Sequence, residues 1–191
     1  MSLLTIAEAV ALCISLLIAI SIVHYTLRFG ISPMPSSSDV RKELLNFLPP
    51  LDSGPIYELG SGFGTLAIPL AQQYPNLQIK GFEVSPVPYW IARVRARYLG
   101  LDNLQFVRKD FLSTDLSQAQ LLVSYLYPEG MKKIAEKLLI KQRPKQYFLS
   151  HTFALPGYEP LKSGRASDLY RSPIYLYEIG AQTSASNAGE A

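Results

Sequence analysis

Three glycines within five residues, Gly60–Gly64, separate a short apolar strand pattern from a helix pattern, and no other feature of the sequence restricts the fold as much. Glycines in such a turn permit tight backbone geometry and let a ligand approach the main chain at the positive end of the following helix. The spacing is GxGxG, and Thr65 stands where a dinucleotide fingerprint needs its third glycine. No Lys-Ser or Lys-Thr pair follows, which excludes a Walker-type phosphate loop.

Strand and helix patterns alternate around this turn. Strand patterns cover residues 56–59, 77–84, 104–108, 120–126 and 145–153, and helix patterns cover 40–47, 65–73, 87–99 and 129–141. Two further strand patterns, 167–171 and 174–179, follow one another directly. We therefore predict an α/β, Rossmann-like fold: a mostly parallel seven-strand sheet with helices on both faces and a C-terminal antiparallel hairpin.

Two acidic positions after the next strands indicate an adenosine ligand. Glu83 ends the strand after the glycine turn, where a carboxylate can accept hydrogen bonds from both ribose hydroxyls. Asp110-Phe111 follows the third strand, where an acid and an aromatic ring suit the amino group and the ring face of adenine. Each feature alone is equally typical of a strand end or a turn cap. Together, and without phosphate-binding chemistry, they predict S-adenosyl-L-methionine as the cofactor.

The N-terminal segment is strongly apolar. Residues 9–27 hold no acidic side chain, lysine or arginine, and as a helix they would rise about 28 Å, close to the thickness of a hydrocarbon core. A cleaved signal peptide and a buried core helix are the alternatives to an uncleaved transmembrane helix. Glu8 stands where a signal peptide needs its basic region, and only Ser15, Ser21 and Thr26 offer the polar stripe of a core helix. Because Arg28, Arg41 and Lys42 follow the segment, we predict a single-pass membrane protein whose catalytic domain faces the cytoplasm.

Composition excludes further classes of site and partner. One cysteine and two histidines cannot form a cysteine-rich zinc site and make a histidine site improbable, so we expect no metal centre. A net charge of +3 is too small to indicate nucleic acid as a partner. Two groups of basic residues fit solvated helix faces or a contact with anionic lipid headgroups: Arg93, Arg95 and Arg97, and the run Lys132, Lys133, Lys137, Lys141, Arg143 and Lys145.

From Pro33 to about Gly180 the chain resembles the class I, seven-strand S-adenosylmethionine-dependent methyltransferases. Within them it is most similar to small protein-lysine methyltransferases, which include the archaeal broad-specificity enzyme and mitochondrial enzymes acting on ATP synthase subunit c and the adenine nucleotide carrier. The matching motifs are PMPS at 33–36, ELGSGFG at 58–64, GFEVSP at 81–86, RKDF at 108–111, SHTFALPGY at 150–158 and YLYEIG at 175–180.

The resemblance implies a role for each matching residue. It places Glu58 and Gly60 at the methionyl part of the cofactor, Gly62 and Gly64 along its back, Glu83 at the ribose, and Asp110 and Phe111 beside the adenine. The chain departs from the family pattern twice. It reads Phe63-Gly64-Thr65 where members usually read Asp-Gly-Arg, and Ser85-Pro86 where they read Asn-Pro.

The methyl acceptor is expected where the fourth and fifth strands end. The fourth strand ends in SYLYP at 124–128, not Asn-Pro-Pro-Tyr, which argues against methylation of adenine N6 or a glutamine amide. Tyr125, Tyr127 and Phe153 are candidates for an aromatic wall around a lysine stem, with ordinary core packing as the alternative for each. The resemblance adds His151 as a candidate base, with a packed strand histidine as its alternative.

These observations predict a membrane-anchored S-adenosylmethionine-dependent methyltransferase that modifies lysine in a protein substrate, for which a membrane protein is a candidate. A small or lipidic acceptor, such as a quinone or a phospholipid headgroup, is one alternative, and a non-catalytic cofactor-binding module is another. The expected division is a transmembrane anchor at 1–29, a linker and leading helix at 30–50, the methyltransferase domain at 51–180 and a disordered tail at 181–191.

Overall fold

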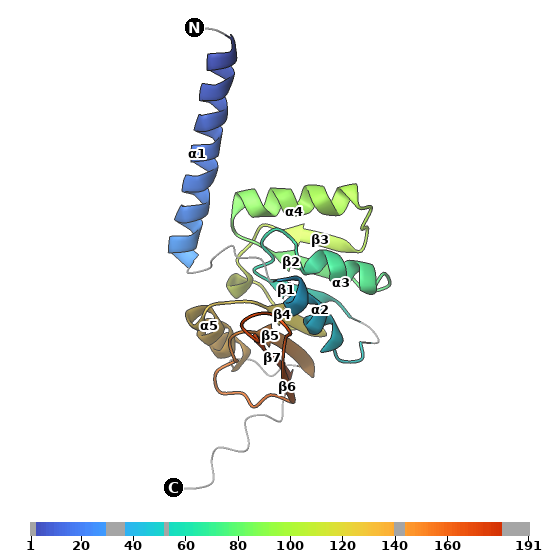
Figure 1. Cartoon of the computed structure of the whole chain (residues 1–191). Coiled ribbons are helices and arrows are strands. Elements are labelled where there is room, and N and C mark those ends of the chain that lie inside the picture. The colour runs from blue at the N-terminus through green and yellow to red at the C-terminus, as the bar shows by residue number, and fades with distance from the viewer. Residues whose placement is uncertain (1–2, 30–36, 52–53, 140–143, 181–191) are drawn as a thin grey trace.

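The computed structural model describes residues 3–29, 37–51, 54–139 and 144–180. The predicted tail at 181–191 and most of the predicted linker lie outside the described residues. Figure 1 shows a sheet surrounded by helices, with α1 projecting away from it. In chain order the elements are α1 (Leu3–Phe29), α2 (Ser38–Asn46), β1 (Ile56–Leu59), α3 (Ala67–Gln73), β2 (Ile79–Phe82), α4 (Pro86–Tyr98), β3 (Leu104–Val107), the short 3₁₀ helix η1 (Phe111–Ser113), β4 (Leu121–Ser124), α5 (Pro128–Leu139), β5 (Gln146–His151), β6 (Lys162–Arg165) and β7 (Pro173–Ile179).

The sheet has seven strands in the order β3-β2-β1-β4-β5-β7-β6. Strands β1 to β5 pair in parallel, and β7 pairs antiparallel with both β5 and β6. This confirms the predicted mostly parallel sheet with a C-terminal antiparallel hairpin. The chain reverses its direction of winding between β1 and β4, which is where open α/β sheets bind ligands.

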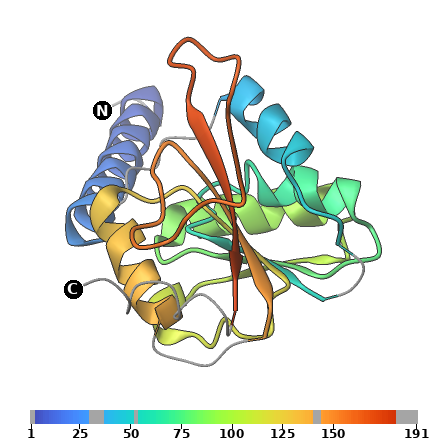
Figure 2. The same ribbon diagram turned by 90° about the horizontal axis from the view of Figure 1, so that it is seen from below.

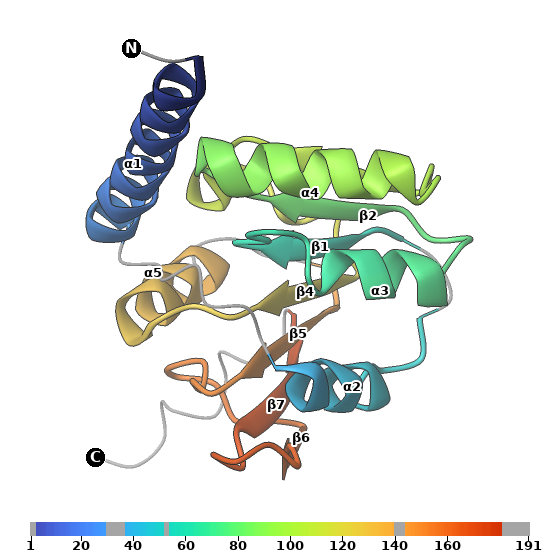
Figure 3. The ribbon, with the colours of Figure 1, turned by 45° about the horizontal axis from the view of Figure 1, so that its top comes forward.

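Helices cover both faces of the sheet, as predicted. Apolar side chains of α2, α3 and α4 form one core cluster with the strands, and those of α5 and η1 form a second cluster on the other face. Figure 2 and Figure 3 show α2 and α5 on opposite sides of the sheet. The four residues of β1 are all buried because this strand lies in the middle of the sheet with helices on both sides.

The hairpin is present, but the prediction of its first strand at residues 167–171 is wrong. The strand is β6, and residues 166–172 form the loop between β6 and β7. Asp168 closes this loop, because its carboxylate accepts hydrogen bonds from the backbone N–H and the hydroxyl of Ser172 at 2.7 and 2.8 Å. Leu169 and Tyr170, which suggested a strand, are 91% and 84% exposed.

Helix α1 is long and apolar enough to cross a membrane between Thr5 and Tyr25, and none of that stretch is buried in the protein. A signal sequence near an N-terminus has the same length and composition, so these properties do not distinguish the two. The helix contacts the domain at α4. In Figure 1 most of its length extends beyond the sheet and its helices.

Candidate active site

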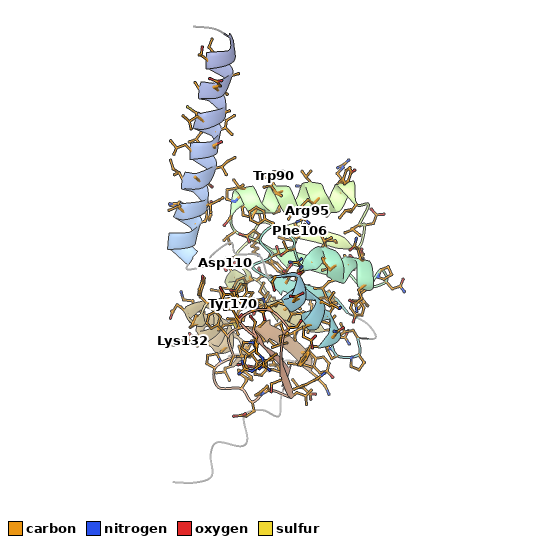
Figure 4. All side chains as sticks on the ribbon, viewed as in Figure 1. Trp90, Arg95, Phe106, Asp110, Lys132 and Tyr170 are labelled. Carbon is orange, nitrogen blue, oxygen red and sulfur yellow. The ribbon has the colours of Figure 1, made fainter. Side chains whose placement is uncertain are left out.

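A cavity of about 270 Å³ lies at the carboxyl ends of β1, β2, β3 and β4. Four of the seven predicted cofactor residues line it: Gly60, Glu83, Asp110 and Phe111. Its other lining residues were not among the predicted cofactor residues: Phe82, Val84, Lys109, Leu112, Leu126, Gly130 and Lys133. Asp110, labelled in Figure 4, lies on the side of the domain where α1 ends.

The glycine turn forms one wall of this region, and its glycines have different neighbours. Gly60 has a φ of +80° and donates its backbone N–H to the Phe82 carbonyl at 2.9 Å. A Cβ on Gly62, at φ +52°, would have no heavy atom within 4 Å. A Cβ on Gly64, at φ +72°, would lie 2.6 Å from the Phe106 ring. Gly62 therefore leaves open space beside the main chain, whereas Gly64 permits close packing against β3.

Glu83 connects the end of β2 to the glycine turn. Its carboxylate is buried and accepts hydrogen bonds from the N–H of Gly62 at 2.8 Å and of Ser85 at 2.7 Å. These two bonds orient the carboxylate and hold the turn. Each oxygen has a further lone pair, so the group retains acceptor capacity for ligand hydroxyls.

Glu58 lies deeper, on β1, and is not among the lining residues of the cavity. Its carboxyl accepts a hydrogen bond from the N–H of Ala67, the first residue of α3, at 3.0 Å. Burial raises its pKa to about 8, with a further contribution from the charge of Glu83 and an opposing one from the Ala67 hydrogen bond. The predicted roles of Glu58, Gly62 and Gly64 toward the cofactor stay predictions.

The third predicted cofactor segment, Asp110-Phe111, lies at the start of the short helix η1, with Asp110 as its N-cap. Oδ1 of Asp110 accepts a hydrogen bond from the Leu112 N–H at 2.8 Å and so caps this helix. The Phe111 ring is buried in the core beneath α5 and also forms part of the cavity wall. The cap fixes the Asp110 side chain, and a carboxylate offers a second oxygen to a ligand amino group.

The four predicted acceptor residues come together where β4 and β5 end, and we call them the aromatic cluster. Tyr125 stacks on His151 with ring centroids 4.0 Å apart, and Tyr127 lies 5.9 Å from Phe153. Between the two tyrosines, Leu126 is buried and points into the cofactor cavity. The aromatic cluster and the cavity therefore meet at one strand end.

A strained turn at Thr152 directs Phe153 toward the cluster, and no sequence pattern predicted this turn. The N–H of Phe153 donates to the His151 carbonyl at 2.8 Å, which closes a three-residue turn around Thr152 at φ +69°. Positive φ is unfavourable for a β-branched residue and is found mainly where surrounding contacts enforce it. Here Thr152 donates to the Pro173 carbonyl at 2.7 Å, and Ser150 Oγ donates to the Phe153 carbonyl at 3.0 Å.

His151 is a packed side chain with little basicity. Burial lowers its pKa to about 4, and the carboxylate of Asp168, in the β6–β7 loop, opposes that shift. Its Nδ1 lies 3.1 Å from the hydroxyl of Thr152. The imidazole is therefore neutral at physiological pH and orients Tyr125 by stacking.

This burial predicts that the contribution of His151 to stability is lost in mild acid. The unfolded chain binds a proton at His151 near pH 6.5, whereas the folded protein does so only near pH 4, so the contribution is complete above pH 6.5 and is lost as the pH falls toward 4. Between pH 7 and pH 4.5 the loss due to His151 should reach about 2 kcal/mol in the free energy of unfolding. The raised pKa of Glu58 acts in the opposite direction over this range, so the effect is measured as the difference between the original chain and His151→Gln, by chemical denaturation in detergent at both pH values. His151→Gln should remove that part of the pH dependence, and an unchanged dependence would contradict the assignment.

The fold and the cavity define the class of protein. The strand order, the open glycine turn, a carboxylate at the end of β2 and an acid-aromatic pair after β3 fit the nucleoside of S-adenosyl-L-methionine. This is a class I S-adenosylmethionine-dependent methyltransferase. The model of the ANTKMT methyltransferase domain matches residues 58–162, just over half of the chain, and the chain belongs to that family.

Known proteins agree with this class. A protein-lysine N-methyltransferase of Saccharolobus islandicus is 23% identical over 77% of this chain and 92% of its own. A carboxy-S-adenosyl-L-methionine synthase of Nautilia profundicola is 33% identical over 52% of this chain, and the match spans only 41% of that protein. An RNA methyltransferase from Salinibacter ruber, solved with S-adenosyl-L-homocysteine, superposes with a TM-score of 0.69 at 25% identity over 78% of this chain and 95% of its own.

Proposed function

We propose that the protein transfers methyl groups to lysine side chains of a protein substrate at a membrane surface. The aromatic cluster beside the cofactor cavity carries this proposal. Aromatic faces stabilise a cationic amine and its apolar stem. A planar amide or adenine would be held by the Asn side chain and a Pro carbonyl of an Asn-Pro-Pro-Tyr strand end, and this strand end reads SYLYP instead. The similarity to a protein-lysine N-methyltransferase of Saccharolobus islandicus supports the same acceptor.

In this proposal the residues of the chain bind and orient the reactants. Glu83 accepts hydrogen bonds from the ribose hydroxyls, and Asp110 accepts one from the adenine amino group. The aromatic cluster holds the lysine stem in line with the cavity. When bound, S-adenosyl-L-methionine supplies an electrophilic methyl group. The lysine must first lose a proton, and an apolar wall favours this because desolvation lowers an amine pKa. His151 is too weakly basic to hold that proton, so it passes to water.

Anchoring by α1 is the second part of the proposal. The apolar stretch Thr5–Tyr25 would span the bilayer, and the basic residues that follow it favour a domain on the cytoplasmic side. Asp110, which lines the cavity, lies on the side of the domain where α1 ends (Figure 4), and this placement would bring the cavity close to acceptors in the same membrane. The same placement would also bring the cavity close to a lipidic acceptor, which is the second candidate substrate. The proposal includes the division of the chain into an anchor at 1–29, a linker and leading helix at 30–50, the methyltransferase domain at 51–180 and a tail at 181–191.

The full chain in nanodiscs, incubated with methyl-labelled cofactor and host membranes, tests the proposed acceptor. We expect label in protein, recovered as methylated lysine after hydrolysis. Tyr127→Leu should lower kcat/KM about 10-fold, because a cation–π contact of roughly 1–2 kcal/mol is lost, without changing cofactor affinity. Tyr127→Phe keeps the ring and should stay near the original rate.

Other distributions of label would contradict the proposal in different ways. Label in the lipid extract would favour the lipidic acceptor. Cofactor binding without any methyl transfer would favour the non-catalytic cofactor-binding module. Tyr147 lies near the start of β5, distant from the cluster, and provides the control. If Tyr147→Leu lowers kcat/KM as much as Tyr127→Leu does, the aromatic wall does not contribute to acceptor binding.

A further inference from the structure

Helix α4 has an unusual distribution of side chains. Its buried face consists of small residues at intervals of four, Pro88, Ala92 and Ala96, which pack toward the sheet. Its opposite face carries large apolar side chains: Trp90 is 52% exposed, Ile91 43%, Val94 63% and Tyr98 89%. We call these four residues the outer face of α4. A helix on a water-exposed surface normally carries polar residues there.

The charges on α4 all have one sign. Residues 86–98 contain three arginines and no acidic residue. Arg95 is used within the domain, since it donates to the Phe63 carbonyl in the glycine turn at 2.7 Å. Arg93 lies over the Trp90 ring at 5.2 Å, and Arg97 is exposed one residue before Tyr98. An apolar stripe with tryptophan and tyrosine, flanked by arginines, is typical of a helix lying in a membrane interface.

The position of α4 relative to α1 fits the same surface. The two helices are in contact, and within residues 5–25 the partly buried side chains of α1 are Ser21, Ile22 and Tyr25, at the domain end of its apolar stretch. Figure 1 and Figure 3 show α4 lying across the direction of α1, and Figure 4 shows Trp90 on the side of α4 turned away from the sheet. Residues 5–20 of α1 would rise about 24 Å beyond this contact, most of the thickness of a hydrocarbon core.

We infer that the outer face of α4 inserts into the interface of a bilayer containing anionic lipids, as a second membrane contact in addition to α1. The inference rests on the proposed anchoring by α1. With α1 across the bilayer and α4 along its surface, the domain has one defined orientation. The arginines favour anionic headgroups, and the tryptophan and tyrosine occupy the headgroup layer.

Trp90 is the single tryptophan of the chain and reports directly on this contact. The full chain is placed in nanodiscs of phosphatidylcholine and phosphatidylglycerol with or without bromine near the start of the acyl chains. We expect a blue-shifted Trp90 emission and about twofold or stronger quenching by brominated lipid. Emission typical of indole in water, without quenching, would overturn the inference. Protection from aqueous acrylamide without bromine quenching would also overturn it and indicate a second copy or another protein.

Two variants make the test specific. The double variant Trp90→Phe, Leu161→Trp moves the probe to an exposed position just before β6, at the opposite edge of the sheet from β3, and should show no quenching. Quenching there as well would indicate general adsorption and overturn the inference. The second variant, Val94→Asp with Arg97→Glu, leaves the buried face of α4 intact and should lose the quenching of Trp90.

Vesicle flotation after an alkaline wash separates this inference from anchoring by α1. A chain that floats while Trp90 stays unquenched overturns the contact of α4 alone. A chain that does not float overturns both the anchoring and the inference built on it. The Val94→Asp, Arg97→Glu variant should still float, because α1 is unchanged.

Discussion

Replacing Glu83 by alanine should weaken S-adenosyl-L-methionine binding at least about 100-fold and reduce methyl transfer to background. Two hydrogen bonds from ribose hydroxyls to a charged acceptor contribute roughly 3 kcal/mol or more together, which corresponds to that factor. The substitution also removes the acceptor for the N–H groups of Gly62 and Ser85, so the glycine turn loses a contact that holds it. Titration calorimetry with the cofactor and a methyl-transfer assay on the full chain measure both effects.

Glu136, an exposed carboxylate on α5, provides the matched control. Glu136→Ala removes the same charge from the chain and should bind the cofactor normally. A thermal unfolding curve of Glu83→Ala shows whether the fold persists. A folded Glu83→Ala protein that binds the cofactor as the original does would show that the ribose is held elsewhere.

Gly64→Ala should destabilise the protein by about 3 kcal/mol, the largest stability effect expected for a single methyl group in the glycine turn. The new Cβ would meet the Phe106 ring at 2.6 Å and Ala92 at 3.2 Å, in addition to a φ of +72°. Overpacking costs roughly 1–3 kcal/mol and the left-handed conformation roughly 1–2 kcal/mol. Chemical denaturation in detergent, followed by near-ultraviolet circular dichroism, measures the difference.

Gly62→Ala is the comparison for Gly64→Ala, because it has the same sign of φ but no neighbour within 4 Å. It should cost only about 1 kcal/mol of stability and should weaken cofactor binding, since the methyl group enters the open space beside the turn. Phe106→Leu should restore part of the stability of Gly64→Ala. Equal destabilisation by the two glycine variants would mean that the contact with Phe106 is not tight.

The residues at the strand ends could be predicted from sequence because chain order alone brings them together. In a parallel sheet every strand ends at the same edge, so an acid after β2, an acid and an aromatic ring after β3 and a glycine turn after β1 must be neighbours. Four predicted residues indeed line one cavity. The alternation of apolar patterns likewise predicted five parallel strands and the helices between them, because each pattern reflects burial on one face or both.

The hairpin shows where such patterns fail. Strand β6 reads Lys-Ser-Gly-Arg and has no apolar residue, so it forms because β7 offers an open edge. Its glycine is required by a distant contact, since the Phe47 ring at the end of α2 lies directly against Gly164. Leu169 and Tyr170 fit a strand pattern in the sequence but are exposed in the loop between β6 and β7. Pairing partners and ring contacts of this kind are not encoded in any local pattern.

Local order was thus sufficient for the fold class, the glycine turn, the carboxylate positions and the apolar helix, because each depends on neighbours a few residues away. Three features required the folded chain. The positive φ of Thr152 is enforced by Pro173 on another strand, and the low pKa of His151 follows from burial between elements. The large apolar side chains of the outer face of α4 are exposed because the small residues of this helix pack against the sheet. Each arises from contacts between segments far apart in sequence, which periodicity does not record.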